Sequence, residues 1–222
     1  MKIAVLVSVG RHPVSGTARY SRNDATALSL ALSLAKQHAA TLDVLHAGDP
    51  SNPALSEYLA LGARSVEVLD LSSIPQWQTD AAPPLATRLK GYDLVLTGTR
   101  AEGAFDSGML PYRVANALAI PLVGAAVNLT IRDDCAEIRQ FMPKGLRRRV
   151  EVDLPALVAV HPMANAAPTY AYARLREGTI RAVPVQAVTH ADHLAWTIRP
   201  ATARPVRLAA AEKRSGHSRM LS

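Results

Sequence analysis

Apolar and polar positions follow two recurring patterns along the first 120 residues of the chain. Predicted strands lie in four segments rich in apolar residues, at 1–9, 41–48, 65–71 and 92–98. The first shows no alternation, which is typical of a strand buried on both faces of a parallel sheet. Segments with apolar residues at helical spacing follow them, at residues 23–39, 53–63, 82–91 and 106–120. Four strand–helix units with short connections predict an α/β fold with a doubly wound, mostly parallel sheet.

Polar and special residues mark the ends of these helices. Asn23 is the candidate N-cap of the first helix, and Asp24 places a negative charge in its first turn. Pro53 suits the first turn of the second helix and Gly62 its C-terminal cap. Pro111 falls in the first turn of the fourth helix, where its missing N–H does no harm.

The pattern changes after residue 121. Residues 124–134 and 136–160 predict strands, with turns at 133–134 and 144–145. Charged residues at 147, 149 and 151 alternate with valines at 150 and 152, which predicts a small, exposed antiparallel ribbon. The three consecutive arginines at 147–149 suit a solvated strand face better than a grip on a phosphate or an acidic partner.

Basic residues gather near the C-terminus. The chain has 222 residues and a net charge of +7, yet residues 1–170 carry 16 basic and 15 acidic side chains, against 9 and 3 in residues 171–222. The nearly neutral first part argues against a nucleic-acid partner, and a basic, proline-containing tail favours an arm that is solvated or wraps a partner. We expect a nucleotide-binding α/β domain over residues 1–190 and a basic C-terminal arm over residues 191–222.

Several classes of protein are excluded by the residues present. The single cysteine, Cys135, excludes an internal disulfide and a multi-cysteine metal site. No apolar run reaches the roughly 18 residues that span a bilayer, and the N-terminal run lacks the small-residue cleavage site of a signal peptide, so we expect a cytoplasmic protein without membrane insertion. The acidic neighbours of Cys135 disfavour its thiolate and the histidines lack metal-ligand spacing, so no catalytic residue is predicted. His161 follows a strand, where an ordinary loop histidine is a better interpretation than a group facing a cleft.

Ligands of an open parallel sheet bind beyond the carboxyl ends of its strands. Three such ends are visible, at Ser8, at Ala47 and at the loop 98–109, which carries three glycines and leads into a helix N-terminus. Unsatisfied N–H groups and the helix dipole favour a phosphate there, although Asp106 or Ser107 capping the helix explains the loop equally well. The loop lacks the Gly-Lys-Ser/Thr of a P-loop, and the first strand is not followed by Gly-x-Gly-x-x-Gly. These features predict a nucleotide-binding, Rossmann-like sheet.

The order of these segments resembles the beta subunit of electron transfer flavoproteins over residues 1–185. The resemblance rests on the order and spacing of MKIAVLVSV, DATALSLALSLAK, LALGARSVEVLD, YDLVLTGTRAEGAFDSGMLPYRVANALAIPLV, VEVDLPALVAV and PTYAYARL. It implies a heterodimer with a larger alpha subunit that holds most of an FAD. The beta subunit would cover one side of that flavin and bury a structural AMP, or a second FAD, in a pocket of its own.

Carried over by position, the resemblance implies that the nucleotide contacts are Ser8, Ala47, Gly98, Asp106, Ser107, Gly108 and Met109. It implies an electron carrier without substrate turnover of its own, which accepts electrons from a flavoprotein dehydrogenase and delivers them to a quinone oxidoreductase. The family docks its dehydrogenase with the segment after the Pro-x-Tyr, which here contains Arg174, Leu175 and Arg176. Leu175 would be an apolar anchor between charges.

Two departures and one alternative accompany the resemblance. Asp106 places a carboxylate in the phosphate loop, where it would repel a phosphate unless it caps the helix. Ser21 and Arg22 stand where the family usually has Asn and Pro. The alternative is a stand-alone, ATP- or AMP-binding stress-type protein of the same broad fold, whose Gly-x₂-Gly-x₉-Gly-Ser/Thr pattern the stretch from Gly98 does not match.

Overall fold

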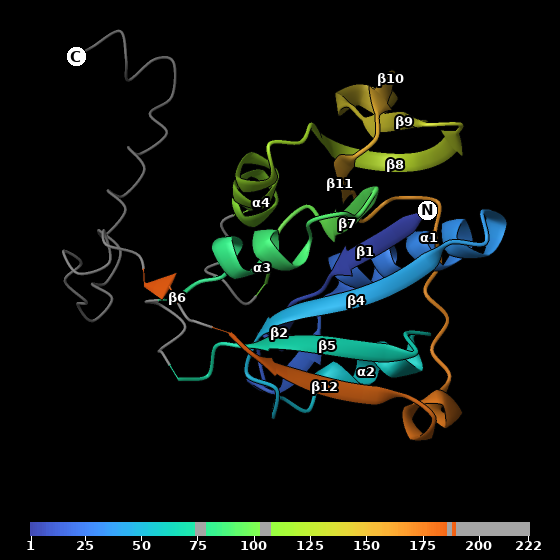
Figure 1. Cartoon of the computed structure of the whole chain (residues 1–222). Helices are drawn as coiled ribbons and strands as arrows, with labels where there is room; N and C mark the ends of the chain where they lie inside the picture. The colour runs from blue at the N-terminus through green and yellow to red at the C-terminus, as the bar shows by residue number, and fades with distance from the viewer. Residues whose placement is uncertain (74–78, 103–107, 186–187, 190–222) are drawn as a thin grey trace, which may run out of the picture.

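A single large sheet forms the centre of the fold, which we describe from a computed structural model over residues 1–73, 79–102, 108–185 and 188–189 (Figure 1). Nine strands from these residues make up the sheet. In spatial order they are β10 (Arg147–Asp153), β9 (Cys135–Phe141), β8 (Leu122–Arg132), β11 (Ala156–Val160), β7 (Leu94–Gly98), β1 (Lys2–Leu6), β4 (Thr41–Gly48), β5 (Ser65–Asp70) and β12 (Thr179–Pro184).

The order of the strands reverses at β1. From β1 the chain moves outward to β4 and β5, then returns to β7 on the other side of β1, and all these neighbours pair in parallel. β11 is inserted in parallel between β7 and β8, whereas β8, β9 and β10 form an antiparallel ribbon at one edge. The carboxyl end of β1 therefore lies at the topological switch point, where sheets of this kind bind ligands.

Helices cover both faces of the parallel strands. One layer contains α1 (Arg22–Gln37) and α2 (Leu55–Ala60), and the other contains α3 (Ala82–Arg88) and α4 (Leu110–Leu118) (Figure 1). Ile3 of β1 packs in the hydrophobic cluster of the first layer and its neighbour Ala4 in the cluster of the second, and both are fully buried. Burial on both faces explains why apolar residues predominate in these strands, and the predicted doubly wound α/β fold is confirmed.

The structure corrects two helix starts. Ser21, not Asn23, is the N-cap of α1: its backbone is extended, and the Asp24 N–H donates to its Oγ at 3.3 Å. Asn23 already lies inside the helix. The N-cap directly precedes the first helical residue, and its side chain accepts from an N–H two or three positions later. Pro53 precedes α2 rather than lying in its first turn. Gly62, at φ +114°, follows α2 as a C-terminal glycine should.

The antiparallel ribbon is confirmed, with left-handed backbone at Asp133 and at Lys144–Gly145. The sequence prediction missed the hairpin of β2 (Val9–Arg11) and β3 (Ala18–Tyr20), where it expected a loop, and the parallel strand β12. The remaining short elements are β6 (Thr79–Asp80), β13 (Val188–Thr189), and the 3₁₀ turns η2 (Pro143–Gly145) and η3 (Tyr172–Arg176). The predicted arm over residues 191–222 lies outside the described residues.

A network centred on Glu67 of β5 ties the edge strand β12 to the second helical layer. The carboxylate of Glu67 pairs with Arg88 of α3, with Nε–Oε1 at 2.5 Å, and with Arg181 of β12. Arg88 also donates to the Tyr92 hydroxyl, which donates to Asp43 at 2.6 Å. The hydrogen bond from Arg88 lowers the pKa of Glu67, which therefore stays charged at neutral pH.

We predict that Glu67→Gln destabilises the fold by roughly 1–3 kcal/mol at pH 7, because two guanidinium groups lose their shared partner. The loss should shrink as the pH falls below about 4.5, because the stability from a lowered folded pKa is fully present above the unfolded value and disappears as the pH falls through the lower folded pKa. Glu151→Gln is the control, since Glu151 and its partner Arg149 are both 60% exposed and such pairs contribute roughly 0–1 kcal/mol. Urea unfolding curves measure both, and equal effects would contradict a structural role of the network.

Candidate functional site

A cavity of about 820 Å³ opens at the switch point, beyond the carboxyl ends of β1, β4 and β7. This volume lies within the range of small-molecule sites. Its walls come from the residues that follow these strands, from the β2–β3 hairpin, and from the start of α4; they include Ser8, Gly10, Arg11, Arg19, Asp24, His46, Ala47, Gly48, Asp49, Arg100, Glu102, Leu110 and Pro111.

The carboxylate of Asp24 joins the ends of β1 and β7 beneath this cavity. Its Oδ2 accepts hydrogen bonds from the backbone N–H and the hydroxyl of Ser8, at 2.8 and 2.6 Å. Its Oδ1 accepts from the N–H of Gly98 at 3.0 Å. A Cβ at position 98 would collide with this carboxylate and with Asn23. Glycine at position 98 therefore permits the approach of α1 to the end of β7.

The environment of Asp24 is nearly dry, since only 3% of the residue is exposed. Burial raises its pKa from 3.8 to about 6, and the hydrogen bonds from Ser8 and Gly98 offset only part of that rise. Three hydrogen bonds from Ser8 and Gly98 hold its carboxylate in place. Asp24 is thus a brace for the floor of the cavity, not an available base.

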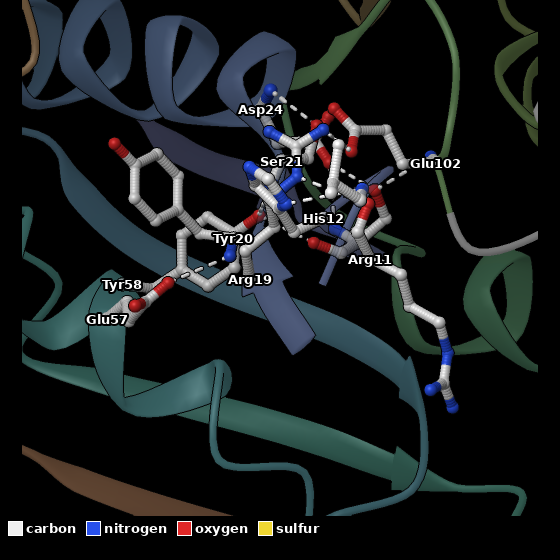
Figure 2. Close-up of polar contacts among 11 residues, drawn as sticks. Arg11, His12, Arg19, Tyr20, Ser21, Asp24, Glu57, Tyr58 and Glu102 are labelled. Atoms are coloured by element: carbon white, nitrogen blue, oxygen red, sulfur yellow. Dashed lines mark hydrogen bonds and ion pairs between the residues drawn. The ribbon is translucent and has the colours of Figure 1, made fainter. Parts of the chain in front are cut away.

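The β2–β3 hairpin closes one side of the cavity through an ion pair. Figure 2 shows Arg19 and Glu102 pointing toward each other, with Nη2 and Oε2 2.9 Å apart. The backbone N–H of Glu102 donates to the Ser8 hydroxyl at 3.2 Å, which connects the hairpin contact to the Asp24 brace. Gly10 lies against the Glu102 side chain, where a Cβ would collide with the carboxylate.

A buried tyrosine fixes the base of the hairpin to α2. The Tyr58 hydroxyl donates to the Ser8 carbonyl at 2.6 Å and accepts from the Ser21 N–H at 3.0 Å. The Tyr20 N–H donates to Glu57 at 2.8 Å in the same region (Figure 2). Burial raises the pKa of Tyr58, so its hydroxyl keeps the proton that this arrangement needs.

The nucleotide contacts carried over from the family resemblance fall into three groups. Ser8 and Ala47 line the cavity, whereas Gly98, which Asp24 joins to Ser8, is not among its lining residues in the described part of the chain. Gly108 packs near Thr99 and Arg100, and Met109, 53% exposed, precedes α4; neither is among the residues that line the cavity in the described part of the chain. Asp106 and Ser107 lie outside the described residues.

The three docking candidates lie in η3, away from the cavity lining. Arg174 and Arg176 are exposed, whereas Leu175 is half-buried and packs against the core of the first helical layer. Tyr172, 70% exposed, is the large apolar side chain that the segment presents to solvent. A hydrogen bond of 2.9 Å from the Ala171 N–H to the Ala60 carbonyl holds this segment against the end of α2.

Sequence reasoning missed several residues of the site. Asp24 was expected only to complement a helix dipole, and His46 was placed among scattered histidines. Each has apolar neighbours that are buried, which is a signal of a buried polar role. His161 stacks on Phe141, with ring centroids 4.3 Å apart, and is not part of the cavity lining.

The structure supplies two further findings on metals and membranes. Within the described ranges, His, Cys, Asp and Glu side chains nowhere form a group of three or more able to hold a metal ion. No helix of the described chain has the length and apolar character needed to cross a membrane.

We predict that Asp24→Asn removes a specific pH dependence of stability. Between pH 3.8 and about 6 the folded state retains a proton on Asp24 that the unfolded state has released. Wild-type stability relative to the variant should therefore fall as the pH rises from about 4 to 7, by up to roughly 3 kcal/mol. Urea unfolding of both proteins across this range measures the difference.

Asp49→Asn is the control, because its effect on stability should change with pH in the opposite direction. Asp49 is exposed, and hydrogen bonds from Ser51 lower its pKa, so its contribution is present at neutral pH and is lost as the pH falls. A difference between wild type and Asp24→Asn that stays flat with pH would contradict a buried carboxylate at position 24.

Comparisons with known proteins agree with this architecture. The family model described as "Electron transfer flavoprotein domain" matches residues 15–193. The chain is also 36% identical, over 225 residues, to the electron transfer flavoprotein subunit beta of Chromohalobacter salexigens, covering 99% of this chain and 82% of that protein. The chain therefore belongs to the beta subunits of the electron transfer flavoprotein family.

Proposed function

We propose that this chain is the beta subunit of a heterodimeric electron transfer flavoprotein. With a larger alpha subunit, it carries electrons from a flavoprotein dehydrogenase to a quinone oxidoreductase and has no substrate turnover of its own. The observation that carries this function is the match to a beta subunit over 99% of the chain. The cavity at the switch point supports it, because nucleotide cofactors bind at that position in doubly wound sheets.

An AMP, or the adenylate part of a second FAD, suits the cavity beside β1. Its volume of about 820 Å³ is sufficient, and glycine at position 48 leaves space beside the His46 ring at the end of β4. Arg11 and Arg100 add positive charge to the wall. Ser8, Ala47 and Gly98 are the described contacts that we propose for the nucleotide, with Asp106, Ser107, Gly108 and Met109 completing the loop on sequence grounds.

The acidic residues of the cavity are compatible with a bound phosphate because each is engaged by the chain itself. Asp24 accepts three hydrogen bonds, Glu102 pairs with Arg19, and Asp49 accepts two hydrogen bonds from Ser51, at 2.8 and 2.7 Å. Hydrogen bonds and opposite charges reduce the repulsion that an unpaired carboxylate would exert on an anion. The cavity therefore need not reject a phosphate.

The FAD of the family supplies the redox chemistry when it is bound. By the resemblance, the alpha subunit holds most of it and the beta subunit covers one side. We assign no residue of the described chain to the flavin, and we assign the cavity beside β1 to the second nucleotide.

We further propose that η3 docks the dehydrogenase through Arg174, Leu175 and Arg176. Leu175 packs inward, so it positions the segment, while the exposed arginines and Tyr172 are available for contact. Tyrosine and arginine dominate the binding energy of many interfaces, and exposed arginines favour approach of an acidic partner surface.

Co-expression with the alpha subunit tests the function directly. The purified complex should be yellow, and mass spectrometry of the nucleotides released on denaturation should find FAD together with AMP, or FAD in twofold amount. A stable complex that contains no flavin would contradict an electron-carrying role. A complex with one FAD and no second nucleotide would contradict only the assignment of the cavity.

The docking segment gives a separate prediction. The charge reversal Arg174→Glu with Arg176→Glu should slow electron transfer from the dehydrogenase at least tenfold at low salt, because charge complementarity governs the association rate. Tyr172→Ala should slow it by roughly 5- to 30-fold through lost contact area. Stopped-flow reduction of the bound flavin by the donor measures both effects.

Arg132→Glu is the matched control for the charge reversal, since Arg132 is exposed at the end of β8 and far along the sheet from η3. It should leave the rate within about twofold. The flavin content of every variant should match the wild type, and equal slowing by Arg132→Glu would contradict a localised docking site.

A further inference from the structure

His46 is a buried polar residue that the fold alone does not explain. It lies near the carboxyl end of β4, opposite Val68 of β5, and is only 8% exposed. Its ring reaches toward β1, where Nδ1 lies 2.8 Å from the carbonyl oxygen of Val7. Because a carbonyl only accepts, Nδ1 carries the proton of this hydrogen bond.

The other ring nitrogen of His46 has no partner in the described chain. Burial lowers the pKa of His46, which favours the neutral ring, so Nε2 presents a lone pair. The ring lines the cavity, and Nε2 lies 2.5 Å from the position that a Cβ on residue 48 would occupy. Glycine at position 48 leaves the space beside Nε2 open. A buried acceptor without a donor is costly, so this atom points to a donor beyond the described residues, and the cavity that the ring lines gives a ligand access to it.

We propose that His46 Nε2 accepts a hydrogen bond from the base or the sugar of the nucleotide in the cavity and so selects which nucleotide binds. This inference rests on the nucleotide site of the proposed function. The partner is an N–H or O–H donor, which in AMP is the exocyclic amine of adenine or a ribose hydroxyl. A phosphate oxygen is excluded, because it would set a negatively charged acceptor against the Nε2 lone pair.

The assignment also orients the nucleotide in the cavity. His46 belongs to β4, whereas Arg100 follows β7, and β1 lies between these two strands in the sheet. The base or sugar therefore lies over β4, and the phosphate lies toward the β7 end and the start of α4, whose N–H groups and dipole favour an anion.

Binding of nucleotide analogues to the nucleotide-free heterodimer tests the inference. Calorimetric titration compares AMP with inosine monophosphate, which lacks the exocyclic amine, and with 2′-deoxy- and 3′-deoxy-AMP, which each lack one hydroxyl. In wild type, one analogue should bind roughly 5- to 30-fold more weakly than AMP, since one hydrogen bond is lost. The analogue that loses affinity identifies the donor as base or sugar.

Variants of His46 separate this role from a purely structural one. His46→Ala should weaken AMP to the level of the affected analogue, leave that analogue unchanged, and so abolish discrimination. His46→Gln, whose Oε1 is an acceptor, should restore part of the preference for AMP. His38→Ala, at the exposed C-cap of α1, should change nothing, and urea unfolding verifies that each variant is folded.

Two negative results have different meanings. If His46→Ala weakens all four nucleotides equally or none of them, the role of His46 is wrong while the nucleotide site stands. If the wild-type complex binds none of the four, the proposed nucleotide site is wrong, and the assignment of His46 fails with it.

Discussion

The contact of the Asp24 carboxylate with the ends of β1 and β7 determines the geometry of the whole ligand end of the sheet. Three donors from two strands converge on one side chain from the first turn of α1. The arrangement keeps a carboxylate almost completely buried and raises its pKa to about 6. Such a cost is tolerated where a group must fix a precise backbone position, and here it fixes the floor of the cavity.

Hydrogen bonds and an ion pair engage the acidic side chains of the cavity, which makes it compatible with the anionic nucleotide that we propose. Asp24 is engaged by backbone and hydroxyl groups, and Glu102 is paired with Arg19 across the mouth. Because the hairpin, the β7 loop and α1 share these contacts through Ser8, a change in one should be transmitted to the others. Nε2 of His46, which has no partner among the described residues, remains available as an acceptor for a ligand.

The docking surface that we propose at η3 lies just before the edge strand β12 and is held against the end of α2. β12 pairs in parallel with β5, and η3 precedes β12 in the chain. The carboxylate of Glu67 in β5 binds both Arg181 of β12 and Arg88 of α3. The proposed docking segment therefore adjoins the same sheet as the cavity, with β4 and β5 between β1 and β12. A rigid sheet can keep a docked donor at a fixed position relative to the ligand end.

The amino-acid sequence was sufficient to predict the strand–helix alternation, the doubly wound sheet, the antiparallel ribbon and the strand ends at Ser8, Ala47 and Gly98. Those features follow from local hydrophobic spacing and from the rule that parallel strands place their carboxyl ends together. Four contacts became visible only in the folded chain. Asp24 bridges two strands, and Arg19 pairs with Glu102. Leu175 packs inward, and β12 pairs with β5. Each of these contacts links residues far apart along the chain, and no local pattern encodes which distant backbone a buried polar side chain will meet.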